Sequence, residues 1–156
     1  MLNFFRFLLL ISMVVWIGML IFFTFFVAPS IFKVLPRELA SDLVGDLFPK
    51  YWMIGYAAGV LSLLSLIAVS LIEKAFPAAR ISLVALMTAM TFYSGLIVGE
   101  KARVMSAEIR NIQDPVKKEE MRARFKKVHA QSAAINMAVM ASGITVIFFM
   151  SRNLRL

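Results

Sequence analysis

The sequence predicts an all-α integral membrane protein, a single-domain four-helix bundle that carries a short interfacial helix and an extended helical hairpin. Of its 156 residues, 61% are hydrophobic, which is well above the apolar share of a soluble domain. These residues gather in four apolar runs, and each is about as long as the roughly 20 residues that a helix needs to cross a bilayer. No run shows the strict apolar–polar alternation of a half-buried strand.

The first half of the chain is predicted to contain two spans, over residues 4–28 and 52–72. The first run is longer than the apolar core of a signal peptide, so we interpret it as an uncleaved span. Pro29 follows it and is expected to kink or end the helix, because proline lacks a backbone donor. Gly55 and Gly59 form a small-x-x-x-small pair in the second span, which predicts the close approach of another helix.

A short amphipathic helix is predicted between these spans, over residues 36–47. Leucines recur every four residues on one side of it and charged residues occupy the other side, as in helices that lie in the plane of the headgroups. Phe48 and Pro49 are expected to end this helix. Tyr51 and Trp52 are then expected to lie in the aromatic belt of the membrane interface.

The second half is predicted to contain spans over residues 81–99 and 129–150, joined by a helical hairpin over residues 100–128. Apolar positions recur there in steps of four and three, which is the pattern of a coiled-coil seam. They are Val98, Ala102, Met105, Ile109 and Ile112 on the first arm, and Met121, Phe125, Val128, Ser132 and Ile135 on the second. Asp114 is expected to cap the second arm, and Pro115 to be its first helical residue.

The last span carries small residues at every fourth position, and such a ridge predicts close contact with another span. The ridge consists of Ala130, Ala134, Ala138 and Ser142. We expect it to pack against the glycine pairs of the second and third spans, Gly55–Gly59 and Gly95–Gly99. This contact would form the packing core of the bundle.

The charges predict both a partner and an orientation. The formal net charge is +8, and the bases lie beside apolar spans, so we expect anionic lipid headgroups at the basic segment 101–127 and no nucleic acid. Twelve of the seventeen Lys and Arg residues lie on the hairpin side of the membrane. The positive-inside rule therefore predicts a multi-pass protein of the bacterial inner membrane, with the hairpin in the cytoplasm and both termini outside. The sequence is also compatible with a homo-oligomer or with binding to a membrane partner.

A polar stripe marks the start of the last span. His129, Ser132 and Asn136 are spaced i, i+3 and i+7, so they share one helix face. Polar groups that enter a membrane are costly unless they face protein or water. We therefore expect the stripe to face the bundle interior, where Trp16 or Tyr51 closes it off.

Glu100 is expected at the same membrane depth as His129, where the third span ends. A carboxylate that faces the imidazole would raise the pKa of His129. The alternative is a solvated charge at the interface. Both interpretations make Glu100 a candidate member of the site.

Two functions remain open for these residues. The first is a non-enzymatic bundle that binds a partner or a small hydrophobic ligand through the polar stripe. The second is a haem- or copper-handling protein that uses His129 as a metal ligand, against the simpler role of a polar cap at the interface. The chain has one histidine and no cysteine, and the motifs G-x-S-x-G and H-E-x-x-H are absent, so no enzyme is predicted.

Two stretches together resemble a known family. The first stretch holds Trp16-Ile-Gly18, Leu35-Pro36-Arg37 and Asp46-Leu-Phe48-Pro49-Lys-Tyr51, and the second is Phe125-Lys-Lys-Val-His129-Ala-Gln-Ser132-Ala-Ala-Ile-Asn136. They resemble the transmembrane protein 205-like family of small four-span membrane proteins, whose animal member is linked to platinum-drug resistance and trafficking. The resemblance implies a four-span fold and motif residues at Trp16, Gly18, Phe48, Pro49, Tyr51, His129, Ser132 and Asn136. It implies no reaction. A looser architectural likeness to copper-resistance membrane domains and to a haem-pathway oxidase accompanies the metal alternative.

Overall fold

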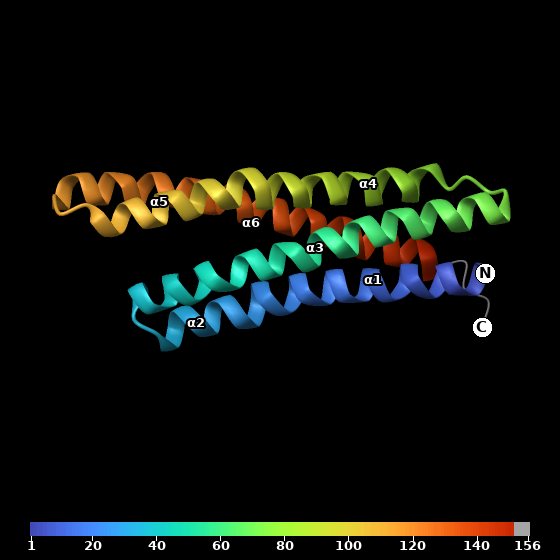
Figure 1. Cartoon of the computed structure of the whole chain (residues 1–156), viewed down its shortest axis with the longest axis horizontal. Coiled ribbons are helices and arrows are strands. Elements are labelled where there is room, and N and C mark those ends of the chain that lie inside the picture. Colours follow the sequence, from blue (N-terminus) through green and yellow to red (C-terminus); the bar gives the residue numbers. More distant parts are fainter. Residues whose placement is uncertain (152–156) are drawn as a thin grey trace.

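The computed structural model describes residues 1–151, which are almost entirely helical. The elements in chain order are α1 (Leu2–Phe22), η1 (Phe23–Val27), α2 (Ala28–Val34), α3 (Arg37–Glu73), α4 (Ala78–Tyr93), η2 (Ser94–Gly99), α5 (Glu100–Asn111) and α6 (Pro115–Ser151). The short π-helices η1 and η2 join their neighbours end to end, so the elements form four long rods (Figure 1). All four rods are long and apolar enough to cross a membrane, which confirms the predicted fold class.

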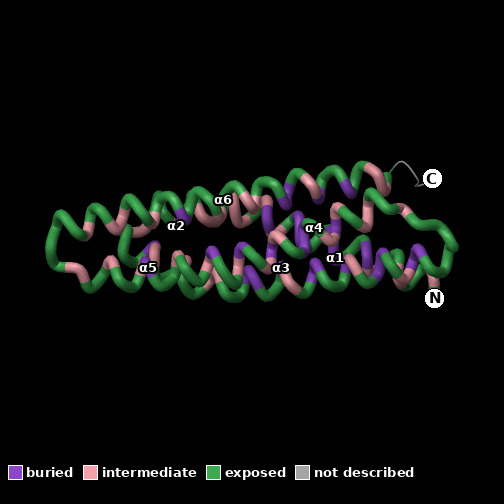
Figure 2. The backbone as a smooth tube through the Cα atoms, turned by 90° about the horizontal axis from the view of Figure 1, so that it is seen from above, coloured by how far each residue is buried: buried purple, intermediate pink, exposed green. Residues whose placement is uncertain are grey.

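The rods pack as an antiparallel bundle in which α1 contacts α3, α3 contacts α4, and α6 contacts both α4 and α1. The two longest helices, α3 and α6, have 37 residues each, or about 55 Å at 1.5 Å per residue. The hydrocarbon core of a bilayer is only about 30 Å thick. Figure 2 shows buried positions gathered in the half that holds the N-terminus, whereas the hairpin half is mostly exposed.

The expected interfacial helix is not a separate element, and this expectation is wrong. Helix α3 runs without a break from Arg37 to Glu73 and contains Pro49 in its interior. The proline removes one backbone hydrogen bond, but the aromatic residues around it hold the helix in place. Phe48 and Tyr51 both pack against Phe23 of η1, with ring centroids 5.4 and 4.9 Å apart.

Pro29 does not end the first helix but coincides with a change in its winding. The backbone N–H of Ala28 bonds to the carbonyl of Phe23, five residues back, and α2 then continues to Val34. Because Pro29 has no N–H, the turn before it widens into a π-helix instead of closing with the usual bonds. Such single-turn π segments are frequent at functional sites.

The hairpin is confirmed in detail. The side-chain oxygen Oδ1 of Asp114 accepts hydrogen bonds from the backbone N–H groups of Val116 and Lys117, at 2.9 and 3.3 Å. Helix α6 begins at Pro115, as predicted. The seam between α5 and α6 is a separate apolar cluster made of Val98, Met105, Val128, Ala102, Met121, Phe125 and Ile135.

The small ridge of the last span does not form the packing core. Ala130, Ala134 and Ala138 are exposed, and the packed residues of the span lie mainly on a neighbouring face of the helix. Val139, Gly143 and Val146 are buried there. Because α6 is one continuous helix, the seam that it makes with α5 fixes its rotation, and this seam continues at heptad spacing through Ile135 and Val139.

Candidate functional site

Trp16 of α1 is fully buried at the centre of the bundle. Its indole lies against α3 at the predicted glycine pair. A Cβ at Gly59 would be 3.1 Å from Trp16 Cη2, and one at Gly55 would be 3.9 Å from Trp16 Nε1. The pair therefore admits the tryptophan of α1, and the expected contact with the small ridge of α6 does not occur there.

Tyr51 and Trp52 are also core residues, 4% and 6% exposed, so their rings face the bundle; their predicted place at the depth of an interfacial aromatic belt stays a prediction. Their rings are 5.0 Å apart, edge to face. The physical reason is the second glycine pair, in η2. A Cβ at Gly95 would be 2.9 Å from Trp52 Cδ2, and one at Gly99 would be 3.1 Å from Trp52 Nε1.

Two buried donors in this core have no acceptor. Trp16 Nε1 and Tyr51 Oη are the only fully buried side-chain nitrogen and oxygen atoms without a hydrogen-bond partner among residues 1–151. Both residues belong to the same apolar cluster. An unsatisfied buried polar group costs about 1–3 kcal/mol, so the core carries a penalty that an additional acceptor would remove.

Ser132 of α6 meets the first residue of η2. Its hydroxyl lies 3.4 Å from that of Ser94, and Ser94 is fully buried beside the glycines of η2. Trp16, Tyr51, Ser94 and Ser132, which we call the central site, thus come from four different rods. Both π-helices border this site, because Phe23 of η1 contacts Tyr51 and Ser94 begins η2.

The polar stripe of α6 only partly faces inward. Ser132 and Asn136 are half-buried, but His129 is exposed, and its expected inward orientation is wrong. Val128 occupies the seam position, so His129 points to one side, where its ring stacks on Phe125 at 6.2 Å and 13°. The Asn136 side chain makes no hydrogen bond to any of the residues 1–151.

Glu100 does not face His129. Its carboxylate accepts two hydrogen bonds from the guanidinium of Arg103, at 2.9 and 2.7 Å. Both groups are exposed, so Glu100 takes the alternative role of a solvated charge at the end of the span.

The described side chains around His129 do not form a metal centre with several protein ligands. Within the described part of the chain, no three His, Cys, Asp or Glu side chains lie close enough to hold a metal ion. Copper bound at His129 would therefore rest on one exposed imidazole that stacks on a phenyl ring, whereas a copper site is built from several N, O or S donors.

The comparison with protein families gives one match. Residues 11–111 match the model of a domain of unknown function, DUF4149. The chain belongs to this family. No curated protein and no solved structure matches it. The DUF4149 match covers Trp16, Tyr51, Ser94 and Glu100 but ends before α6, which holds the polar stripe.

The central site includes residues that the sequence did not single out. In the sequence, Ser94 is one residue of a predicted apolar span, although the neighbouring pair Gly95–Gly99 indicates close packing there. A second buried contact, the 2.7 Å hydrogen bond between the hydroxyls of Ser12 and Ser62, joins α1 to α3. No sequence pattern pointed to that bond, because serine is common in membrane helices.

Proposed function

We propose that this member of the DUF4149 family is a non-enzymatic membrane protein that binds a small, mainly apolar ligand at the central site. The observation that carries the proposal is the pair of buried donors without acceptors, Trp16 Nε1 and Tyr51 Oη. A carbonyl or ether oxygen of a ligand would satisfy them. Natural structures leave few buried donors unpaired, so two in one cluster favour a missing acceptor.

The surroundings of these donors suit a ligand that is otherwise apolar. Phe23 and Phe48 beside Tyr51 are only half-buried, which leaves aromatic surface for further contact. On the side of α6, the half-buried Asn136 offers an amide without a partner. Ligand sites in membrane bundles combine apolar walls with a few polar groups in this way.

Replacing Tyr51 by phenylalanine tests the proposal. In ligand-free protein, Tyr51→Phe is expected to raise the free energy of unfolding by about 1 kcal/mol, because it removes an unpaired buried hydroxyl and keeps the ring. After incubation with a total lipid extract, native mass spectrometry is expected to find a small-molecule adduct on the wild type that Tyr51→Phe loses.

Tyr93→Phe is the matched control for this experiment. Tyr93 is 44% exposed, and its hydroxyl accepts a hydrogen bond from the Gln131 amide at 3.3 Å. This variant should keep the adduct. Equal adducts on wild type and Tyr51→Phe, or a less stable ligand-free Tyr51→Phe, would contradict the proposal.

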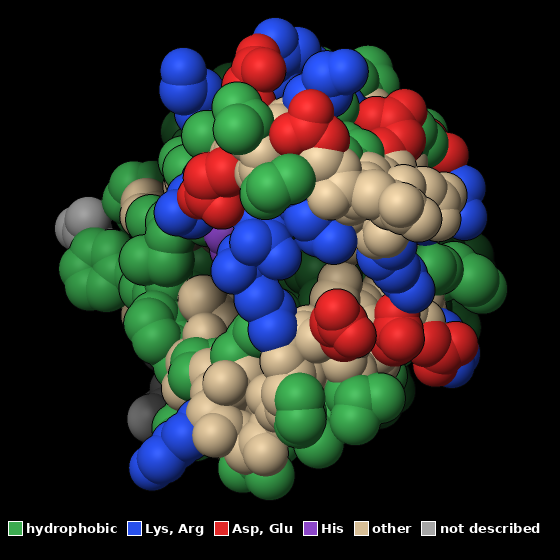
Figure 3. All heavy atoms as spheres, turned by 90° about the vertical axis from the view of Figure 1, so that its left-hand side faces the viewer, with side chains coloured by type: hydrophobic (Ala, Val, Ile, Leu, Met, Phe, Trp, Pro, Cys, Tyr) green, Lys and Arg blue, Asp and Glu red, His purple; other side chains and the backbone are tan. Residues whose placement is uncertain are grey.

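We also propose a more specific family and a membrane location with a defined orientation. The motif residues Trp16 and Tyr51 are both buried in the main apolar cluster, which supports membership of the transmembrane protein 205-like family. The excess of bases at the hairpin end supports a bacterial inner-membrane protein with the hairpin in the cytoplasm. Figure 3 shows many Lys and Arg side chains on this end, with Asp and Glu among them. Exposed bases near the span, such as Lys126 and Lys127, suit contact with anionic headgroups.

Cysteine labelling tests this orientation directly, because the chain has no native cysteine. Asn111→Cys at the hairpin tip is expected to react with a membrane-impermeant maleimide only after the inner membrane is opened. Ala78→Cys, at the exposed start of α4 at the opposite end, is expected to react in intact spheroplasts. The reverse pattern would invert the topology.

A further inference from the structure

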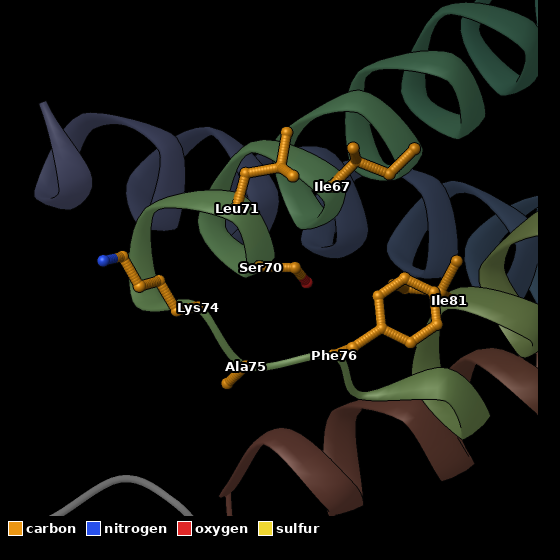
Figure 4. A pocket seen from close by; sticks show the side chains of 7 residues that line it. All are labelled: Ile67, Ser70, Leu71, Lys74, Ala75, Phe76 and Ile81. Carbon is orange, nitrogen blue, oxygen red and sulfur yellow. The ribbon is translucent and has the colours of Figure 1, made fainter.

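A pocket of about 340 Å³ lies at the end of the bundle opposite the hairpin. It opens between the last turns of α3 and the first turn of α4. Its lining is apolar apart from one serine and one lysine, and consists of Ile67, Ser70, Leu71, Lys74, Ala75, Phe76 and Ile81. Figure 4 shows Ile67, Phe76 and Ile81 around the opening and Lys74 at its edge, with the amine directed outward.

The turn that shapes the pocket is held by its backbone. Lys74 ends α3 in the left-handed region, at φ 51° and ψ 32°, which is uncommon for a residue with a side chain. The N–H of Ala75 bonds back to the carbonyl of Ser70 at 3.2 Å. The Ser70 hydroxyl already donates a hydrogen bond to the carbonyl of Leu66, at 2.8 Å. Lys74 is therefore the lining residue that can still donate to a polar ligand.

The Lys74 ammonium has no acidic partner among the described residues. The neighbouring acid, Glu73, forms an ion pair with Arg6 of α1 and is thereby neutralised. The rim of the pocket therefore presents an unpaired positive charge above an apolar floor. This combination is complementary to an anionic group that carries a hydrocarbon chain.

The position of the pocket points to a lipid. It lies at the end of two apolar helices, where headgroups meet hydrocarbon. Leu71 and Phe76 are 74% and 79% exposed there, and in a membrane such side chains are covered by acyl chains. A basic side chain at this depth extends toward the headgroups and attracts anionic lipids.

We propose that this pocket is a binding site for one anionic phospholipid. Its acyl chain lies on Ile67, Phe76 and Ile81, and its phosphate pairs with Lys74. A zwitterionic lipid offers the same phosphate but carries its own cation, so the site prefers an anionic headgroup. The site is separate from the central site and does not depend on the ligand proposed there.

Native mass spectrometry of the full chain in detergent tests the site, with phosphatidylglycerol and phosphatidylcholine of identical chains as probes. Phosphatidylglycerol is expected to bind the wild type more tightly. Lys74→Asn removes the charge and retains a residue that tolerates the left-handed conformation. It is expected to weaken phosphatidylglycerol binding about fivefold, and Lys74→Arg is expected to restore it.

Lys33→Asn is the matched control, because Lys33 is an exposed lysine at the hairpin end. It should leave the affinity unchanged. Phe76→Ser tests the acyl contact and should weaken binding of phosphatidylglycerol, whereas glycerol phosphate without chains should not compete. The proposal would be overturned if the two lipids bound equally or if Lys74→Asn kept the wild-type affinity for phosphatidylglycerol. Competition by free phosphate at equal concentration would also overturn it.

Discussion

Replacing Gly95 by alanine is expected to destabilise the bundle by about 1–3 kcal/mol. A Cβ at this position would overlap the Tyr56 hydroxyl and lie 2.8 Å from Tyr56 Cζ and 2.9 Å from Trp52 Cδ2. Neither ring has an easy way to move. Tyr56 stacks on Phe92 with centroids 4.4 Å apart, and Trp52 is buried against both glycines of η2.

The measurement is the unfolding of detergent-solubilised protein by increasing fractions of SDS. Gly18→Ala is the matched control, since Gly18 is also a glycine in a membrane helix but has nothing within 4 Å of a Cβ. Alanine there should be neutral or stabilising, because it lowers the entropy of the unfolded chain. If Gly95→Ala is as stable as Gly18→Ala, α3 and η2 are not in the close contact described here.

Replacing Trp16 by alanine is expected to cost about 3 kcal/mol or more. The ring is fully buried and fills the space above Gly55 and Gly59. In a membrane, the unfolded helix still places its apolar groups in lipid, so the loss comes mainly from the cavity and the missing van der Waals contacts. The small glycines cannot refill that space, so little relaxation is expected.

Two further variants make this prediction specific. Phe22→Ala removes an aromatic residue of the same helix that is 61% exposed, and it should cost far less in the same SDS titration. Trp16→Phe keeps much of the ring and removes the unpaired Nε1, so it should recover much of the loss. Equal stability of Trp16→Ala and Phe22→Ala would show that Trp16 is not at the centre of the bundle.

The separation of an apolar bundle from a polar hairpin was predictable because it depends on local chemistry. Runs of apolar residues of sufficient length form membrane-spanning helices whatever they pack against. The first residue of the second hairpin arm could be predicted because Asp114 and Pro115 have strong positional preferences at a helix start. Its seam, with Met105 and Val128, stands out because apolar residues there alternate with charged ones.

The central site was only half predictable. The sequence singled out Trp16, Tyr51 and Ser132, of which the fold buries Trp16 and Tyr51 in the main apolar cluster and leaves Ser132 half-buried against Ser94. It could not show that Ser94 joins them, or that the seam through Val128, and not the polar stripe, would set the rotation of α6 and leave His129 exposed.

By itself, the sequence determined the four spans, the cap and the seam of the hairpin, and the unequal distribution of charge between the two ends. Only the tertiary structure decided which faces of the spans meet. Within the membrane nearly every face of α6 is apolar, and lipid solvates apolar side chains as well as protein does. Periodicity therefore carries little information there. Beyond the seam with α5, the rotation of α6 is held by close fits such as Gly143 against Ile17 and Met87.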